Sequence, residues 1–140
     1  MNNLSFHITD ITANSIRANA SEIGLSVEEQ DTRIVIRITD NGSGMDAETA
    51  RRVTNPFYTT RTTRKVGLGL PFLIQNAEQT GGSVTLTSEP GKGTEVRAVF
   101  HSDHIDCPPW GDLPGTVALL ITGNPEINVC FEYRSGETGY

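Results

Sequence analysis

The sequence predicts an α+β fold in which a mainly antiparallel sheet has one face covered by helices. Apolar residues recur at helical spacing over residues 4–20. Further along, two pairs of segments alternate apolar and polar residues around short turn-forming stretches, as half-buried hairpin strands do. With 140 residues, 36% of them hydrophobic and 20% charged, the chain has the size and composition of one compact domain.

The first helix is predicted from the residues that fall on one side of it, which are Leu4, Ile8, Ile11, Ser15 and Ala18. We expect Ser5 to cap it. Its other side carries Asp10, Asn14 and Arg17, so that a carboxylate, a carboxamide and a guanidinium stand in one row. A solvated helix face has the same pattern, and the rest of the chain has to decide between the two interpretations.

Two hairpins are predicted from alternating segments. In residues 23–28 and 33–38, Ile, Leu or Val takes every second position, and residues 29–32 between them are polar turn material. The second pair, residues 83–88 and 95–100, is joined by a loop that contains one proline and two glycines. These patterns predict four strands.

Two helices are predicted between the hairpins. Residues 46–54 form a short helix, which Asp46 caps and Pro56 stops. A longer helix opens at residues 67–70, has Pro71 in its first turn, and ends at the glycine pair 81–82.

The last forty residues differ in kind. Residues 101–111 are polar and contain prolines, which indicates a surface linker, and Trp110 is expected to anchor it to the core. Residues 112–122 predict a helix, with Asp112 as cap and Pro114 in its first turn, although residues 117–121 fit a buried strand equally well. Residues 127–133 predict a fifth strand.

Within the linker, His101, His104 and Cys107 lie close together in sequence. A structural zinc site needs four ligands in a recognised spacing, so we interpret this cluster as polar linker rather than as a metal site.

Charge and hydropathy exclude several classes of protein. The net charge of −6 and the pI of about 4.9 argue against non-specific electrostatic binding to nucleic acid or to an anionic membrane surface. The longest apolar run, residues 117–121, is far shorter than the roughly 20 residues of a membrane span. We therefore expect a cytoplasmic protein in which Cys107 and Cys130 remain reduced.

A nucleotide pocket is predicted from residues 40–70. Asp40 ends a strand and is followed by glycines at positions 42 and 44. A carboxylate in this position can accept hydrogen bonds from the exocyclic amine of adenine. Asp-Asn-Gly also occurs in ordinary solvent-facing turns, which is the alternative interpretation. The glycine turn at residues 67–70 opens a helix, where backbone N–H groups favour phosphate. A basic, threonine-rich loop containing Arg61, Arg64 and Lys65 precedes that turn and can close over a nucleotide.

Together these motifs resemble the histidine-kinase-like ATPase superfamily (GHKL). The matching stretches are Asn14, residues 40–45 (DNGSGM), 55–60 (NPFYTT), 67–70 (GLGL) and 91–94 (GKGT), in the order and spacing of that superfamily. Within it, the chain is most similar to the ATP-binding domain of sensor histidine kinases and of anti-sigma-factor serine kinases. The resemblance covers residues 6–100. It implies the Bergerat fold, a two-layer α+β sandwich whose mixed, mainly antiparallel sheet is covered on one face by about three helices, here with a C-terminal helix–strand extension.

The resemblance also implies ligands and site residues. ATP and Mg²⁺ are the implied cofactors; Asn14 would hold the metal, Asp40 the adenine amine, and Phe57 would be the hinge of the lid. The implied nucleotide-binding residues are Asn14, Arg17, Ala18, Asp40, Gly42, Gly44, Met45, Phe57, Thr59, Thr60, Arg61, Arg64, Lys65, Gly67, Leu68, Gly69, Leu70 and Thr94.

Two departures from the family pattern shape the functional expectation. Asp10 stands where hydrolysing members have a glutamate that activates water, and its side chain is one methylene shorter, which favours phosphoryl transfer to a nucleophilic side chain over vigorous hydrolysis. Asp10 is therefore the candidate catalytic residue, as a modest base. His7 lies on the first helix itself, so we expect it to be packed or solvated and not to be a phosphoacceptor.

We expect residues 1–100 to form the ATP-binding domain, with residues 101–140 packed on it as an extension. The expected function is a stand-alone domain that transfers phosphoryl to a partner protein or slowly hydrolyses ATP. The alternative is a non-catalytic module in which nucleotide gates binding to a partner protein. A dimer clamp of the gyrase or mismatch-repair type is disfavoured, because no transducer segment follows residue 100.

Overall fold

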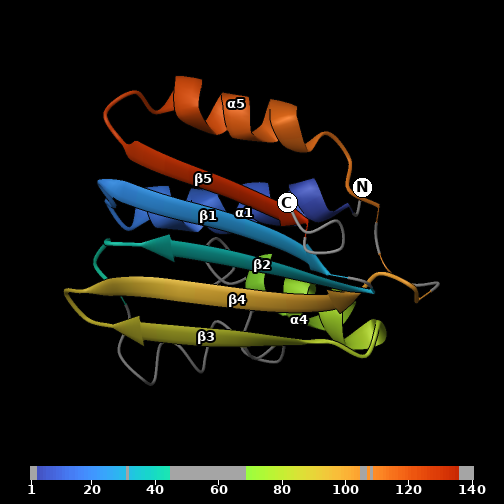
Figure 1. Ribbon diagram of the computed structural model, residues 1–140. Helices are drawn as coiled ribbons and strands as arrows, with labels where there is room; N and C mark the ends of the chain where they lie inside the picture. Colours follow the sequence, from blue (N-terminus) through green and yellow to red (C-terminus); the bar gives the residue numbers. More distant parts are fainter. Residues whose placement is uncertain (1–2, 31, 45–68, 105–106, 108, 136–140) are drawn as a thin grey trace.

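The computed structural model describes residues 3–30, 32–44, 69–104, 107 and 109–135. It confirms the predicted class, because five strands form one mixed sheet with helices on one side (Figure 1). The elements, in chain order, are α1 (Leu4–Arg17), β1 (Glu22–Gln30), β2 (Arg33–Asp40), α4 (Gly69–Gln79), β3 (Ser83–Glu89), β4 (Gly93–His101), α5 (Leu113–Gly123) and β5 (Asn128–Ser135).

The sheet has the strand order β3-β4-β2-β1-β5. Both predicted hairpins are present, β1 with β2 and β3 with β4, and antiparallel pairing of β2 with β4 joins them. The strand β5 pairs parallel to β1, with Leu25 opposite Phe131, which makes the sheet mixed. The alternation seen in the sequence places Ile34, Ile36 and Ile38 on the buried face.

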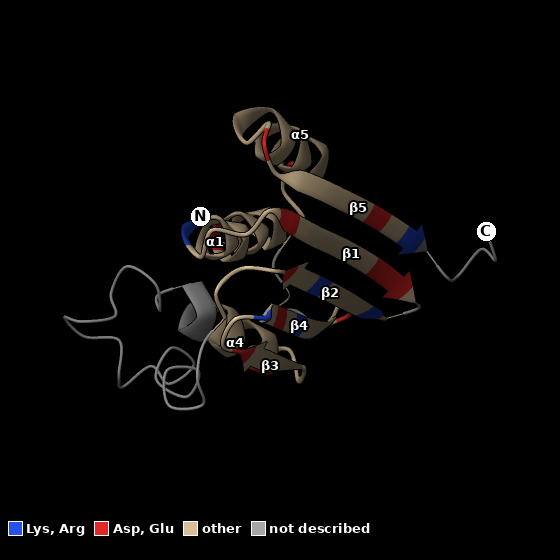
Figure 2. Ribbon diagram, turned by 90° about the vertical axis from the view of Figure 1, so that its left-hand side faces the viewer, with Lys and Arg blue, Asp and Glu red and all other residues tan. Residues whose placement is uncertain are grey.

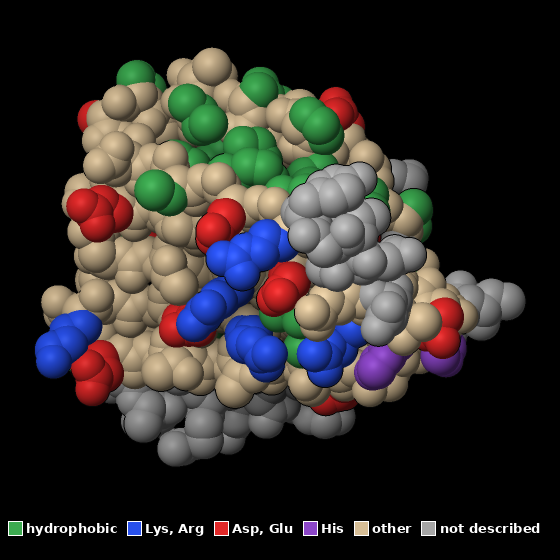
Figure 3. All heavy atoms as spheres, viewed as in Figure 1, with side chains coloured by type: hydrophobic (Ala, Val, Ile, Leu, Met, Phe, Trp, Pro, Cys, Tyr) green, Lys and Arg blue, Asp and Glu red, His purple; other side chains and the backbone are tan. Residues whose placement is uncertain are grey.

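The helices α1 and α4 cover one face of this sheet, and α5 packs against α1 beside the edge strand β5 (Figure 2). The core lies between these layers. Its least exposed side chains include those of Leu4, Ile8, Ile23, Leu25, Val27, Ala77 and Phe100. The opposite face of the sheet carries charged side chains, such as the Arg37–Glu95 ion pair at 2.8 Å, and stays open to solvent (Figure 3).

Both ends of α1 differ from the prediction. Asn3, not Ser5, caps the helix, since the Asn3 side chain accepts a hydrogen bond from the backbone N–H of Phe6 at 2.7 Å. The helix ends at Arg17 rather than at residue 20. Asn19 adopts a left-handed conformation with φ of 64°, and the N–H of Ala20 donates to the carbonyl of Ser15, which closes the helix.

The predicted C-terminal helix and strand and the Trp110 anchor are confirmed. Residues 113–123 form a helix and not a strand, and the Asp112 side chain accepts from the N–H of Gly115 as its cap. Trp110 anchors the linker, because its indole Nε1–H donates to Glu29 at 2.9 Å.

The turn between β1 and β2 is shorter than predicted. The prediction placed it at residues 29–32, but β1 continues through Gln30, so Glu29 belongs to the strand.

Three other findings bear on the predictions. No disulfide joins Cys107 to Cys130. Among the helices in the described ranges, none is long and apolar enough to cross a membrane. The predicted short helix at residues 46–54 lies outside the described residues.

Candidate functional site

Asp40 is the centre of a polar corner at the end of β2. Its Oδ2 accepts a hydrogen bond from the hydroxyl of Ser15 on α1 at 2.6 Å, and its Oδ1 accepts from the backbone N–H of Gly42 at 2.8 Å. Thr94 lies directly opposite Asp40 on β4, with its hydroxyl 2.8 Å from that of Ser88. We call Ser15, Asp40, Gly42, Gly44 and Thr94 the Asp40 corner. Each carboxylate oxygen of Asp40 has a further lone-pair direction with which it can accept another donor.

The glycine turn of this corner is clamped between two other segments. A Cβ on Gly42 would lie 2.8 Å from both the Cβ and the carbonyl oxygen of Ala18, and the N–H of Ser43 donates to that same oxygen at 2.9 Å. Gly44 has a φ of 73°, and a Cβ there would lie 1.9 Å from the carbonyl oxygen of Glu89. Glycine is therefore required at both positions by close approach, and at Gly44 also by conformation.

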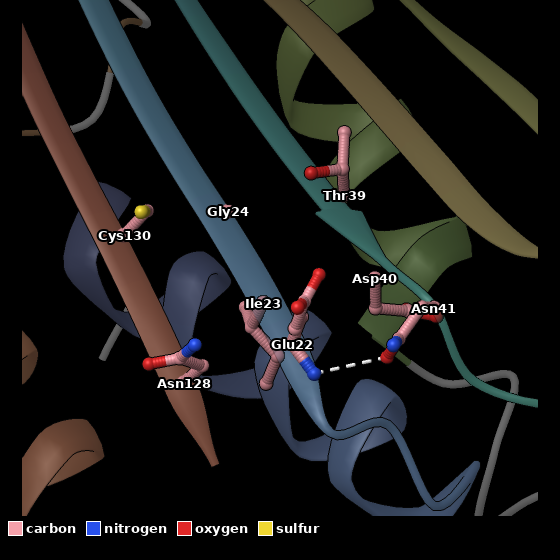
Figure 4. Close-up of a pocket in the computed structure, with 8 residues that line it drawn as sticks. All are labelled: Glu22, Ile23, Gly24, Thr39, Asp40, Asn41, Asn128 and Cys130. Atoms are coloured by element: carbon pink, nitrogen blue, oxygen red, sulfur yellow. Dashed lines mark hydrogen bonds between the residues drawn. The ribbon is translucent and has the colours of Figure 1, made fainter.

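Asn41 fixes the turn from the other side. Its Oδ1 accepts hydrogen bonds from the backbone N–H groups of Ser21 and Glu22, both at 2.9 Å. Figure 4 shows Asn41 reaching toward Glu22 at the rim of a hollow of about 390 Å³, which is also lined by Thr39 and Cys130. The turn that carries Asp40 is thus tied to β1 as well as to α1.

The predicted row on α1 exists. The guanidinium of Arg17 donates to Oδ1 of Asn14 at 2.5 Å, and Asn14 is half-buried while Arg17 is exposed. Burial raises the pKa of the Asp10 carboxyl, and the charge of Arg17 lowers it again in part. Because Asn14 and Ser15 are adjacent on one helix, the row and the Asp40 corner are positioned by the same element.

His7 is a packing residue, which confirms one of the two expectations for it. The side chain is 1% exposed, and its Nε2 lies 2.8 Å from Nδ2 of Asn76 on α4. Burial lowers the pKa of His7 to about 4, so the imidazole is neutral at pH 7. Its ring also lies near that of Phe100, with the ring centroids 6.4 Å apart.

Half of the predicted nucleotide-binding residues lie outside the described residues. These are Met45, Phe57, Thr59, Thr60, Arg61, Arg64, Lys65, Gly67 and Leu68. Gly69 and Leu70 begin α4, as a helix opened by a glycine turn requires. The lid and the phosphate-binding turn therefore stay predictions.

The sequence reasoning missed Ser15 and Asn41. Ser15 was expected only as a small residue tolerated in the core, yet a hydroxyl that is 3% exposed requires a hydrogen-bond partner, and that requirement was a usable signal. Asn41 is typical of turns in general, and nothing local to it indicates a bond to residues 21 and 22.

Comparison with known proteins finds sensor proteins and kinases among the relatives of this chain. A putative sensor protein of Shewanella frigidimarina is 32% identical over 66% of this chain, and the sensor histidine kinase YxdK of Bacillus subtilis is 29% identical over 69% of it. Sporulation kinase C of Bacillus subtilis is 30% identical over 71%. The matched regions span only 15%, 32% and 23% of these three relatives, respectively.

A sequence profile gives the family directly. The profile of the histidine kinase-, DNA gyrase B- and HSP90-like ATPases matches residues 3–104, which include α1, the Asp40 corner and strands β1 to β4. The fold agrees with it, since a mixed sheet lies under helices on one face. The chain therefore belongs to the family of histidine kinase-, DNA gyrase B- and HSP90-like ATPases.

Proposed function

We propose that this chain binds ATP with Mg²⁺ at the Asp40 corner and passes the γ-phosphoryl group to a partner protein, or slowly to water. One observation carries the proposal. Asp40 is held by two donors, from Ser15 and from Gly42, and each of its oxygens keeps a further lone pair for the adenine amine. Membership of an ATPase family supports ATP as the nucleotide.

The residues present fit a magnesium ion at Asn14. A carboxamide oxygen is a hard ligand of the kind that Mg²⁺ takes, and Mg²⁺ in nucleotide sites commonly has few protein ligands in addition to phosphates and water. The ion, when bound, would neutralise charge on the phosphates. The Asn14 oxygen now accepts from Arg17, and two cations repel each other at one oxygen, so Arg17 has to turn away to admit the metal. Its guanidinium can then contact a phosphate.

Asp10 is the proposed base. It lies on the same helix face as Asn14, one turn before it, and its raised pKa brings its proton affinity closer to neutral pH, where a general base works best. Its short side chain limits its reach toward a water molecule, which supports transfer to a side-chain acceptor.

A second function is favoured by the Arg17–Asn14 bond. If Arg17 keeps the Asn14 oxygen when nucleotide binds, magnesium-assisted transfer is blocked, and the domain becomes a nucleotide-gated binding module. The two functions share the same adenine contact and differ in the fate of the γ-phosphate.

The first experiment tests the site. ATP affinity is measured by calorimetry with and without Mg²⁺ for the parent, Asp40→Asn and Asn14→Ala. We expect Asp40→Asn to weaken ATP binding by at least about tenfold, because a charged acceptor is lost, and Asn14→Ala to remove the benefit of Mg²⁺. Asp103→Asn, in the exposed linker, is the matched control. Parent-like binding by both site variants would disprove the proposed site.

The second experiment follows the γ-phosphate. ATP labelled at that position is incubated with the protein alone and with candidate acceptor proteins. Transfer or steady release that Asp10→Ala abolishes supports the enzyme and the role of Asp10. Tight binding without either favours the module.

A further inference from the structure

The helix α5 and the edge strand β5 form an apolar groove of about 440 Å³. Three aromatic side chains line it, those of Trp110, Phe131 and Tyr133, together with Val117 of α5 and the carboxylate of Glu29. Phe131 is 40% exposed and Tyr133 is 48% exposed. Hydrophobic side chains gather over this part of the molecule, while charged ones lie over β2 and β4 (Figure 3). We call it the α5–β5 groove.

Among the described residues that line the groove, Glu29 is the one acidic residue. Its Oε2 accepts from Trp110 Nε1–H at 2.9 Å, and its Oε1 accepts from the hydroxyl of Tyr133. Both donors are neutral, and the hydrogen bond to Glu29 raises the pKa of Tyr133. Across the described ranges no Lys, Arg or His forms an ion pair with this half-buried carboxylate. A negative charge therefore lies in an apolar pocket where the described residues supply no counter-ion.

This combination selects one class of ligand. Aromatic faces attract weakly hydrated cations, and the carboxylate adds a full opposite charge to that attraction. An anion would be repelled, and a hydrated metal ion would need several oxygen ligands where the groove offers one carboxylate. The groove is also large enough for a small organic molecule. We propose that the α5–β5 groove binds a small organic cation, namely an amine or quaternary ammonium with an apolar body.

One wall of the groove, Trp110, is held in place by the fold itself. The carbonyl of Trp110 accepts from the backbone N–H of Ser5 at 3.1 Å and from the Ser5 hydroxyl at 2.6 Å, while its indole is held by Glu29. Trp110 is thus anchored to α1 through its backbone and to β1 through its side chain. A preorganised aromatic wall lowers the entropy cost of binding.

The chain carries its own reporter, because Trp110 is its only tryptophan. Tryptophan fluorescence is recorded while choline is added at constant ionic strength, and again with 3,3-dimethylbutan-1-ol, which has the same shape without the charge. We expect a saturable change with choline and binding at least about tenfold weaker for the alcohol. Equal binding of the two probes, or no saturable binding of choline, would overturn the proposal. Both measurements use the unaltered protein, so they do not depend on a variant that folds.

Two variants test whether the carboxylate of Glu29 is the charge that attracts choline. Glu29→Gln is expected to weaken choline binding by about tenfold and to leave the alcohol unchanged. Glu132→Gln is the matched control. It also removes one negative charge, but at a residue of β5 that does not line the groove, and it should leave choline binding unchanged. If the two variants weakened choline binding equally, the effect would come from the net charge of the protein and not from Glu29 in the groove, which would overturn the proposal. Tighter binding of N-acetyl-lysine methylamide than of choline would overturn the small-molecule ligand in favour of a protein side chain.

Discussion

The Asp40 corner and the α5–β5 groove lie at opposite ends of the β1–β2 hairpin, since Asp40 pairs with Ile23 and Glu29 pairs with Ile34. They are built from opposite kinds of contact. The corner depends on backbone segments that approach closely at glycines and on hydrogen bonds to one carboxylate. The groove depends on aromatic and aliphatic surface around one carboxylate. The corner should therefore tolerate almost no added atom, whereas the groove should respond mainly to lost apolar contact or lost charge.

The largest effect is expected at Gly44. Gly44→Ala places a Cβ 1.9 Å from the Glu89 carbonyl in a left-handed conformation, so the two loops have to separate, which should cost about 3 kcal/mol of unfolding free energy. Gly91→Ala is the matched control, because Gly91 has a φ of 80° but no atom of the described part of the chain lies within 4 Å of a Cβ built there. It should cost only about 1 kcal/mol. Urea unfolding of both variants measures the difference. Equal losses would show that conformation and not close approach constrains the corner.

On α5, whose N-terminal half contributes to the groove, a loss of stability is expected where a buried apolar side chain is removed. Leu120 is 7% exposed and Leu119 is 73% exposed on the same helix, α5. Leu120→Ala should cost about 2.5 kcal/mol of unfolding free energy and Leu119→Ala less than about 0.5 kcal/mol. Neither should change ATP affinity, because α5 contributes nothing to the Asp40 corner. A loss of ATP binding in Leu120→Ala would show that α5 and the Asp40 corner are coupled.

His7 lies in the interface of α1 with α4, and its burial predicts a pH dependence of stability. Its pKa is about 4 in the folded state and 6.5 in a model peptide, so the unfolded chain takes up the proton first as pH falls. Stability is therefore full above pH 6.5 and is lost progressively toward pH 4. Between pH 7 and pH 5 the loss should be about 2 kcal/mol.

His7→Gln tests this contribution when the pH dependence of the unfolding free energy is compared between the parent and the variant. The change in unfolding free energy between pH 7 and pH 5 should be smaller in the variant by about 2 kcal/mol. Asp10, whose pKa is raised, acts in the opposite sense and is present in both proteins, so it cancels. An unchanged pH dependence in the variant would remove His7 as its source.

The strands and the direction of their buried faces could be predicted because alternation is a local signal, which Ile34, Ile36 and Ile38 follow. Asp40 and Asn14 could be placed in one site only through the resemblance to a family, since nothing local connects positions 26 residues apart. The parallel pairing of β5 with β1 was not predictable. Residues 127–133 indicate a strand, but the partner of a strand is decided by contacts distant in sequence.

The groove was missed for a related reason. Glu29 was expected in a turn, where a carboxylate needs no explanation, and only the extension of β1 to Gln30 places it beneath Trp110 and Tyr133. The start of α1 was misassigned because Asn and Ser are both good caps, and the hydroxyl of Ser5 is used instead to hold the Trp110 carbonyl.

The smallest expected effect separates the two regions most sharply. Ser5 and Ser15 lie on the same helix, are 4% and 3% exposed, and each donates one hydrogen bond of 2.6 Å. Ser5 holds Trp110 of the groove and Ser15 holds Asp40 of the corner. Ser5→Ala and Ser15→Ala should each cost about 1 kcal/mol of unfolding free energy, because each leaves one half-buried acceptor with one donor fewer.

Their effects on ligands should differ even though their stability losses match. Only Ser15→Ala should weaken ATP binding, by up to about tenfold, because the Asp40 carboxylate then loses the hydroxyl that orients it. Only Ser5→Ala should change the fluorescence titration with choline, because the backbone of Trp110 loses one of its two tethers to α1. If either serine variant altered both ligands, α1 would transmit between the corner and the groove, and the two sites would have to be treated as one coupled system.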